Sequence, residues 1–140
     1  MKEASLYPPL VAGALRCGWP LYRIRDDAGG RKPFDIGGCS ARGLGVALEA
    51  KVIRSSLTTE GYMPWDLFEP HQQQWLRVFA NTGAIALAVF YWQANAVVRA
   101  YRVPNSTNLM PLGMRLCDMD SFELQYNTEL KAYIGWPTCL

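Results

Sequence analysis

Residues 45 to 52 read GVALEAKV, a small and apolar run that is interrupted by Glu49 and Lys51. Such a run predicts a largely buried strand. Side chains alternate across a strand, so Glu49 and Lys51 project to one face together with Ala47. The other face is purely apolar and is expected to meet the core; it carries Val46, Leu48, Ala50 and Val52. An acid and a base on the first face therefore need a chemical reason.

A second acid is predicted to lie beside this strand. The segment FDIGG, residues 34 to 38, has the pattern of a short strand, and the following residues 38 to 43, GCSARG, are compatible with a hairpin connection. Antiparallel pairing would bring the carboxylate of Asp35 beside that of Glu49. Two carboxylates forced together repel each other unless a cation shares them. We therefore expect a divalent metal ion at Asp35 and Glu49.

This donor set suits Mg²⁺, which prefers oxygen ligands, retains waters and is typically held by one or two carboxylates plus substrate phosphate. Asp35, Glu49 and the main-chain carbonyl of Ala50 form such a partial shell. A bound metal acidifies its water and screens the charge on a reacting phosphodiester. Lys51 is placed to orient that water or to stabilise the transition state. The pattern predicts phosphodiester hydrolysis with Mg²⁺, for which Mn²⁺ substitutes. A cross-strand ion pair on a solvated face explains E-x-K alone equally well.

The rest of the sequence predicts alternating helices and strands. In order, the expected elements are a helix at 8 to 18, strands at 20 to 25, 34 to 38 and 43 to 53, a loop at 53 to 68, a helix at 70 to 83, and strands at 84 to 92 and 95 to 103. This order predicts a single α/β domain, residues 1 to 140, with a mixed central sheet flanked by helices. Further on, a short helix is expected at 121 to 133, capped by Asp120 or Ser121.

Charge and composition narrow the partners. The net charge is only +2, but residues 1 to 56 hold nine bases against five acids. This excess suits a partner that carries phosphates, although a solvated arginine-rich face explains it equally well. Six bases flank the proposed site and are candidates for DNA-phosphate contacts, each of them alternatively an ordinary surface charge: Arg23, Arg25, Arg31, Lys32, Arg42 and Arg54.

Several classes of site and location are disfavoured. The four cysteines are widely scattered, which argues against a zinc site or a disulfide framework and favours reduced thiols in the cytoplasm. His71 is the single histidine and is expected to pack or cap a helix. The longest apolar stretch, residues 84 to 92, is far shorter than the ~20 residues of a membrane helix. No secretory signal is recognised near the start, so we expect an intracellular protein without a membrane partner.

Three motifs together carry a family resemblance. They are P33-F-D-I36, L48-E-A-K51, and P70-H-Q-Q-Q-W75 leading into T82-G-A-I-A-L-A-V89, in that order. The chain resembles the PD-(D/E)XK nuclease superfamily, and within it Holliday junction resolvases of the archaeal Hjc and RecU kinds, with VRR-NUC nucleases as near relatives. The approach R25-D-D-A-G-G-R-K-P-F-D35 is similar to that of archaeal-type resolvases. The resemblance covers about residues 3 to 103 and leaves 104 to 140 as a C-terminal extension.

The resemblance implies a restriction-endonuclease-like α-β-β-β-α-β core and a role for each matching residue. Asp35 and Glu49 match the two metal-binding acids, and Lys51 matches the catalytic lysine. Glu3 matches an acid at the first helix that supports the metal or its water, although Pro8 and Pro9 depart from the usual uninterrupted helix. Gln72 matches a glutamine that faces the site; its alternative is an exposed position in the QQQ run.

The resemblance also implies a homodimer that resolves four-way DNA junctions by paired symmetric nicks. Interface candidates are the loop at 62 to 68 and the C-terminal segment with Tyr133, Ile134 and Trp136. Three alternative roles are open for residues 62 to 65 of this loop: stacking on bases, contact with a partner subunit, or packing on the domain itself. Two alternatives stay open: a restriction-like or VRR-NUC-type nuclease acting on duplex, flap or single-stranded DNA, and a DNA-binding module without catalysis. A small standalone resolvase would suit a phage protein acting in the host cytoplasm.

Overall fold

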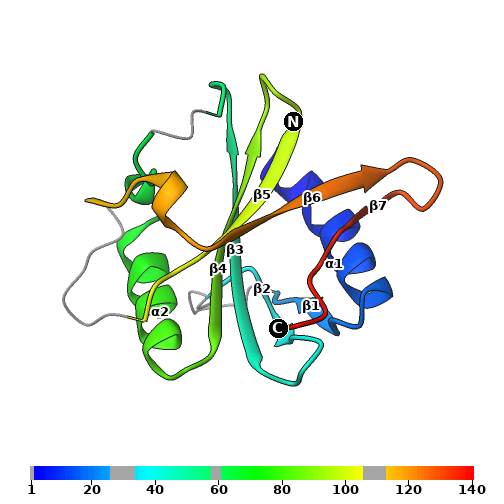
Figure 1. The fold of residues 1–140 in the computed structure, drawn as a ribbon, viewed down its shortest axis with the longest axis horizontal. Coiled ribbons are helices and arrows are strands. Elements are labelled where there is room, and N and C mark those ends of the chain that lie inside the picture. Colours follow the sequence, from blue (N-terminus) through cyan, green and yellow to red (C-terminus); the bar gives the residue numbers. More distant parts are fainter. Residues whose placement is uncertain (1, 26–33, 58–60, 106–112) are drawn as a thin grey trace.

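One sheet of seven strands runs through the molecule in the order β1-β2-β3-β4-β5-β6-β7 (Figure 1). The structure is a computed structural model that describes residues 2 to 25, 34 to 57, 61 to 105 and 113 to 140. The strands are β1 (Leu21–Arg23), β2 (Ile36–Cys39), β3 (Gly45–Ile53), β4 (Ile85–Trp92), β5 (Val97–Arg102), β6 (Ser121–Asn127) and β7 (Ala132–Ile134). The helices are α1 (Tyr7–Arg16) and α2 (Pro70–Asn81), with 3-10 turns η1 (Glu3–Ser5), η2 (Trp65–Leu67) and η4 (Leu116–Asp118).

The centre of the sheet is the parallel pair β3 and β4, which α2 connects. A parallel pair needs such a crossover, whereas the antiparallel neighbours are joined by short turns or loops. All neighbouring strands other than β3 and β4 are antiparallel. β4 is buried along nearly its whole length, as its continuous apolar sequence predicts. The predicted α/β class, the mixed sheet and the α-β-β-β-α-β order are confirmed.

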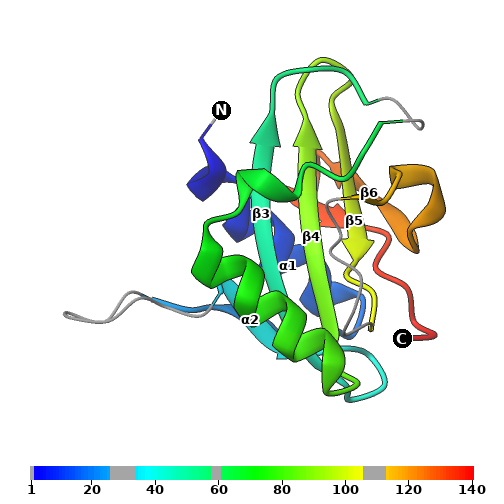
Figure 2. The ribbon, with the colours of Figure 1, turned by 90° about the vertical axis from the view of Figure 1, so that its left-hand side faces the viewer.

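The two helices cover opposite faces of the sheet: in Figure 2, α2 lies in front of β3 and β4, and α1 lies behind them. On the side of α1, here the α1 face, Leu10 packs with Leu48 and other buried side chains of the sheet. On the side of α2, here the α2 face, Leu76 packs with Ala47 and a group of aromatic rings. β3 therefore contributes to both cores, with alternate residues on each.

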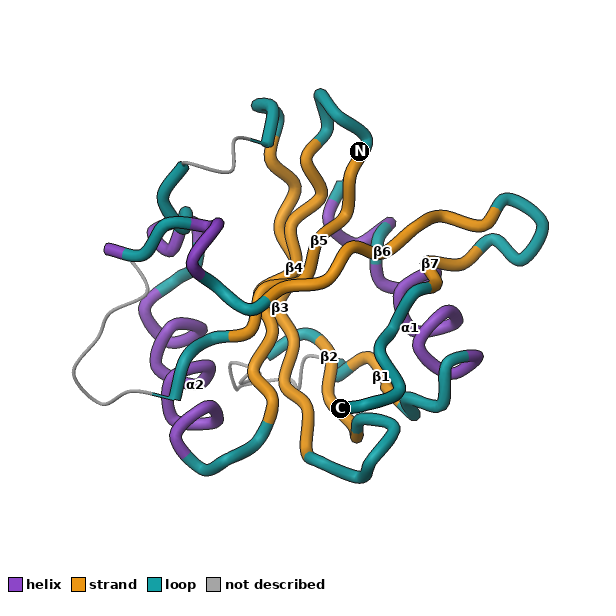
Figure 3. The backbone as a smooth tube through the Cα atoms, viewed as in Figure 1, coloured by secondary structure: helices purple, strands orange, loops and turns teal. Residues whose placement is uncertain are grey.

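Both helices have the termini that their sequences predict. Pro8 and Pro9 lie in the first turn of α1, where missing amide protons cost no helical hydrogen bond. At the start of α2, Glu69 and Gln72 form a capping box. Gly18 and Gly83 follow the helix ends with φ of 84° and 87°, a left-handed conformation that glycine adopts without strain. The tube in Figure 3 shows both helices ending in short turns.

The predicted helix at 121 to 133 is wrong, because this segment forms the β6-β7 hairpin. Phe122, Leu124 and Tyr126 alternate with Glu123 and Gln125, which is the period of a strand. β6 pairs with β5 and extends the sheet, where residues 121 to 124 find main-chain partners. The alternation, rather than the capping signal at the start of the segment, decides its structure.

The C-terminal segment packs on α1 rather than offering an open apolar surface. A Cβ atom on Gly13 of α1 would overlap the main-chain carbonyl of Tyr133 in β7, so α1 and β7 are in direct contact. Tyr133 and Trp136 are 7% and 3% exposed. As interface candidates these two residues are therefore wrong. Within the described residues, no helix is long and apolar enough to cross a membrane.

Candidate functional site

Asp35, the residue just before β2, lies beside Glu49 of β3. β2 and β3 pair with Ile36 opposite Leu48, so the next position of the same register places Asp35 opposite Glu49. The main-chain carbonyl of Asp35 accepts a hydrogen bond from the amide of Ile24 at 2.9 Å, which continues the ladder to the preceding strand. Directly opposed residues in such a pair have Cβ atoms about 5 Å apart. The two residues are 6% and 1% exposed, so they share a nearly buried location.

Gln72 binds Glu49 and is itself held at the start of α2. Its Nε2 donates to Oε2 of Glu49 at 3.2 Å, and its Oε1 accepts from the main-chain amide of Glu69 at 2.9 Å. Because both ends of the amide are used, the capping box fixes the orientation of the donor toward Glu49. The first turn of a helix also carries partial positive charge, which favours a carboxylate or a phosphate here.

Tyr7 reaches Asp35 from the first turn of α1. Its hydroxyl donates a hydrogen bond to Oδ2 of Asp35. Burial, the hydrogen bond to Asp35 and the nearby charges of Asp35, Glu49 and Glu3 all raise the pKa of Tyr7 above its usual value. The hydroxyl therefore stays protonated and remains a donor at any physiological pH. The guanidinium of Arg23 lies 4.8 Å from the centre of the Tyr7 ring, which places a cation beside this site.

Lys51 lies two residues beyond Glu49 on the same face of β3. Its Nζ is 3.8 Å from Oε2 of Glu3 and 5.7 Å from the centre of the Phe68 ring. The side chains of Lys51 and Glu3 are 16% and 42% exposed, so the ammonium is close to the surface but not free in solvent. Glu3 belongs to η1, a separate turn before α1, and not to the helix itself.

The donor set at this position is small. No three His, Cys, Asp or Glu side chains among the described residues gather closely enough to hold a metal ion on their own. Asp35 and Glu49 are two nearly buried oxygen donors, and Ala50, fully buried, follows in the chain with its carbonyl. This set fits a hard cation that keeps several waters and takes further oxygens from its substrate, which is the behaviour of Mg²⁺. It does not fit a closed structural site.

The comparisons with known proteins add a likeness to solved structures. The sequence matches no family model, and no curated protein is significantly similar to it. Among solved structures, the chain is similar to Hjc, a Holliday junction resolvase from the archaeal hyperthermophile Archaeoglobus fulgidus. The identity is 19%, the match covers 73% of each chain, and the TM-score is 0.49. At this level of similarity, the reaction has to be argued from the residues of the site.

The predicted DNA-binding bases lie at different distances from the site. Arg23 contacts Tyr7 and is therefore adjacent. Arg54 lines a surface depression of about 530 Å³ together with Lys2, Glu3, Val52 and Gln93. Arg42 lies in the β2-β3 turn, seven residues from Glu49, which corresponds to roughly 23 Å along an extended chain. Arg25 is exposed just beyond β1, and Arg31 and Lys32 lie outside the described residues.

Two further side chains lie near the site, Tyr7 and His71. Tyr7 is the residue that the sequence analysis missed, because its contact with Asp35 joins segments 28 residues apart and no local pattern marks it. His71 lies beside the cap of α2, with its Nδ1 3.3 Å from Oε2 of Glu69. This position agrees with the capping role expected for His71 and leaves the two carboxylates to Gln72 and Tyr7.

Proposed function

We propose that this protein is a Mg²⁺-dependent endonuclease that hydrolyses DNA phosphodiesters, with Asp35, Glu49 and Lys51 as its catalytic residues. The observation that carries the proposal is two nearly buried carboxylates close to the same Tyr7 hydroxyl, Asp35 just before β2 and Glu49 on β3, with a lysine two residues beyond Glu49 on the same face of the strand. Burying a carboxylate costs free energy unless hydrogen bonds or a cation compensate it. A purely structural role would be served better by the apolar residues that fill the rest of β3.

The roles of the residues follow from their positions. Asp35 and Glu49, with the carbonyl of Ala50, would hold the ion, and the more exposed Glu3, which pairs with Lys51, would act on its water. Bound Mg²⁺ would supply a more acidic water and neutralise charge on the phosphate. Lys51, 3.8 Å from Glu3, is held where it can orient that water or stabilise the charge that develops on the phosphate oxygens. Gln72 keeps the carboxylate of Glu49 in place, and Tyr7 does the same for Asp35.

The proposed substrate is the four-way DNA junction, and the proposed active form is a homodimer. This part rests on the motifs that resemble those of junction resolvases. Two symmetric nicks at one branch point require two identical sites, which a two-fold dimer provides. Apolar side chains available for such an interface are exposed on η2 and α2: Leu67 is 45%, Trp75 46% and Val78 50% exposed. Trp75 and Val78 are three positions apart in α2 and share one side of the helix.

A second candidate function is a DNA-binding module without catalysis. The ion pair between Lys51 and Glu3 favours it, because a lysine whose partner is an exposed glutamate needs no metal chemistry to be satisfied. In that case the cluster of charges would act only in stability or in phosphate contacts. The two candidates predict different results for a single substitution, Asp35→Asn.

The test compares wild type, Asp35→Asn and a matched control, Asp66→Asn, an exposed aspartate on η2. The carboxamide that Asp35→Asn introduces can still accept the hydrogen bond of Tyr7, so the fold should be retained. We expect the wild type to nick a four-way junction symmetrically in the presence of Mg²⁺ and to prefer it over a linear duplex with the same arms. Asp35→Asn should abolish nicking while junction binding persists, and Asp66→Asn should leave both unchanged. Wild-type protein that binds junctions but never cuts them with Mg²⁺ or Mn²⁺ would establish the binding module instead.

A further inference from the structure

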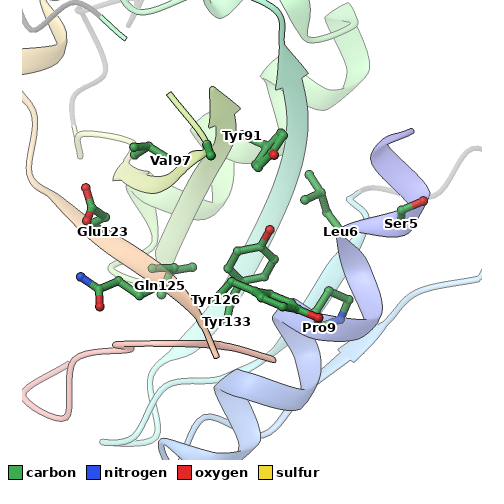
Figure 4. A pocket seen from close by; sticks show the side chains of 11 residues that line it. Ser5, Leu6, Pro9, Tyr91, Val97, Glu123, Gln125, Tyr126 and Tyr133 are labelled. Carbon is green, nitrogen blue, oxygen red and sulfur yellow. The ribbon is translucent and has the colours of Figure 1, made fainter. Parts of the chain in front are cut away.

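A cavity of about 550 Å³ opens on the α1 face of the sheet, between α1, the β4-β5 turn and the β6-β7 hairpin (Figure 4). Three tyrosines define it, and we call it the tyrosine pocket: Tyr91 of β4, Tyr126 of β6 and Tyr133 of β7. Leu6 and Pro9 line the side toward α1, while Ser5, Glu123 and Gln125 add polar groups. A volume of this size accommodates a small organic ligand.

The rings are arranged for a flat, partly apolar guest. In Figure 4 the rings of Tyr126 and Tyr133 lie next to each other below Tyr91. Their centroids are 5.1 Å apart at an interplanar angle of 66°, so the edge of one ring supports the other. Tyr133 is 7% exposed and forms part of the floor, whereas Tyr126 is 49% exposed and offers an open ring surface. Nucleobases stack on such aromatic surfaces irrespective of their sequence.

The tyrosine pocket is connected to the proposed catalytic residues through η1. Tyr91 is paired across the sheet with Val52, the residue after Lys51, and both pack on the α1 face, whereas Lys51 itself projects to the other face of β3. η1 borders both regions, because Glu3 contacts Lys51 while Ser5 lines the pocket. A DNA strand that binds at both places would therefore pass around η1.

The charge along this route suits a polyanion. Lys2 and Arg54 line the surface depression that also contains Glu3 and Val52, the residue paired with Tyr91 of the pocket. The carboxylate of Glu123 at the pocket is balanced by Arg99, whose Nη2 is 3.6 Å away. Basic side chains next to an aromatic surface are the usual combination for binding single-stranded nucleic acid.

We propose that the tyrosine pocket binds an unpaired nucleobase of the DNA substrate, taken from the strand that passes the nuclease site. The proposal rests on the proposed function, since it needs DNA at Asp35 and Glu49. Tyr126 stacks on the base, Tyr91 brings its hydroxyl to the edge of the base, and Lys2 and Arg54 contact the backbone phosphates. A four-way junction supplies such a base where pairing opens at the branch point.

A combined protein and DNA substitution tests this inference. Fluorescent junctions are prepared with one abasic nucleotide at the same position of two opposite strands, and the position is moved stepwise through the branch point. Binding of wild type and Tyr126→Ala to each junction is measured by anisotropy in EDTA, so that no cleavage occurs. We expect Tyr126→Ala to weaken binding of the intact junction by about tenfold or more. At the one position where the missing base would have entered the pocket, the variant should bind as tightly as the wild type.

Two further variants separate stacking from folding. Tyr126→Phe keeps the ring and should bind the intact junction within a few-fold of wild type. Leu130→Ala, at an exposed residue of the same hairpin, should leave binding unchanged. If Tyr126→Ala loses the same affinity on every junction, or loses none, the inference is overturned.

Cleavage of the same junctions with Mg²⁺ keeps the two proposals apart. If the junctions are cleaved normally but Tyr126→Ala weakens binding equally at every abasic position, the proposed base-binding role of the tyrosine pocket is refuted and the proposed nuclease function is not. A base-dependent effect without any cleavage refutes the nuclease and retains the pocket. Wild-type protein that binds none of the junctions refutes both.

Discussion

The two faces of β3 differ in what they bury. On the α1 face, Val46, Leu48 and Ala50 are at most 1% exposed and belong to one apolar core. On the α2 face, Ala47 is followed by Glu49 and Lys51, although the neighbouring strand β4 is apolar there as well. An apolar face contributes stability through burial, whereas a face with a buried carboxylate gives some of it up. Both faces carry a packed core, and the comparison supports our proposal that the chemistry is confined to the part of the α2 face where β2 meets β3.

The largest effect should come from removing the charge of Glu49. Glu49→Gln has nearly the same shape and can still accept the hydrogen bond from Gln72, but it loses the negative charge that a metal ion needs. We expect the single-turnover rate of junction nicking to fall on the order of 10³-fold or more. The free energy of unfolding in urea should stay the same or rise, since a neutral amide costs less to bury than a charge.

The control for this experiment is Glu129→Gln, an exposed glutamate between β6 and β7. It should change neither the nicking rate nor the stability. If Glu49→Gln unfolds the protein while Glu129→Gln does not, Glu49 has a structural role and the division of β3 into a packing face and a chemical face fails.

The next largest effect should come from Leu48, the residue before Glu49, whose side chain lies on the α1 face. A substitution there should lower stability and spare activity, the opposite of what we expect for Glu49→Gln. Leu48 is completely buried on the α1 face. Leu48→Ala should lower the free energy of unfolding by about 2 to 5 kcal/mol, because it removes buried methyl groups and leaves a cavity. The nicking rate per folded molecule should remain close to that of the wild type. Leu48→Met, which conserves volume, should cost less than about 1.5 kcal/mol and is the matched control.

Tyr7 provides a third test, because it belongs to the α1-face core and yet donates a hydrogen bond to Asp35. Tyr7→Phe keeps the ring in the core and removes only the donor. Groups that orient metal ligands typically contribute 10-fold to 100-fold in metal affinity or activity. We expect a loss of roughly that size at limiting Mg²⁺ and a smaller loss at saturating Mg²⁺, measured as the Mg²⁺ dependence of the nicking rate. An equal loss at all Mg²⁺ concentrations would argue against a positioning role.

Much of the α2 face could be predicted from local patterns. Alternation along β3 separates Glu49 and Lys51 from the apolar set, and the small-residue connection to β2 predicts the pairing that places Asp35 opposite Glu49. Both signals depend on residues within one hairpin. The roles of these side chains in catalysis remain predictions, as do the metal and the dimer.

Contacts between distant segments were beyond the sequence patterns. Tyr7 and Asp35 are 28 residues apart, and their hydrogen bond depends on how α1 docks on the sheet. The β6-β7 hairpin was missed because a polar residue before an apolar run resembles a helix cap, while the alternation that decides the matter is only seven residues long. The tyrosine pocket combines residues of α1, β4, β6 and β7, so no single motif marks it.

The smallest predicted effect concerns the buried tyrosines, one on each face. Burial raises the pKa of Tyr101 on the α2 face to about 12, against the opposing charge of Arg99, and burial also raises that of Tyr133 on the α1 face. Because the folded protein holds these protons more tightly than the unfolded chain, their contribution is complete below about pH 10 and is lost as the pH rises through the folded-state pKa, which for Tyr101 is about 12. Tyr101→Phe and Tyr133→Phe should each reduce the fall in unfolding free energy between pH 10 and 12, measured in urea.

An equally steep fall in either variant would mean that the corresponding tyrosine is not desolvated in the folded protein. The two variants need not respond equally, because Arg99 opposes the rise in the pKa of Tyr101, whereas Tyr91 and Tyr126 add to the rise in the pKa of Tyr133. Desolvation is the largest cause at both tyrosines, so both should contribute to the loss of stability in alkali whatever the face on which they lie.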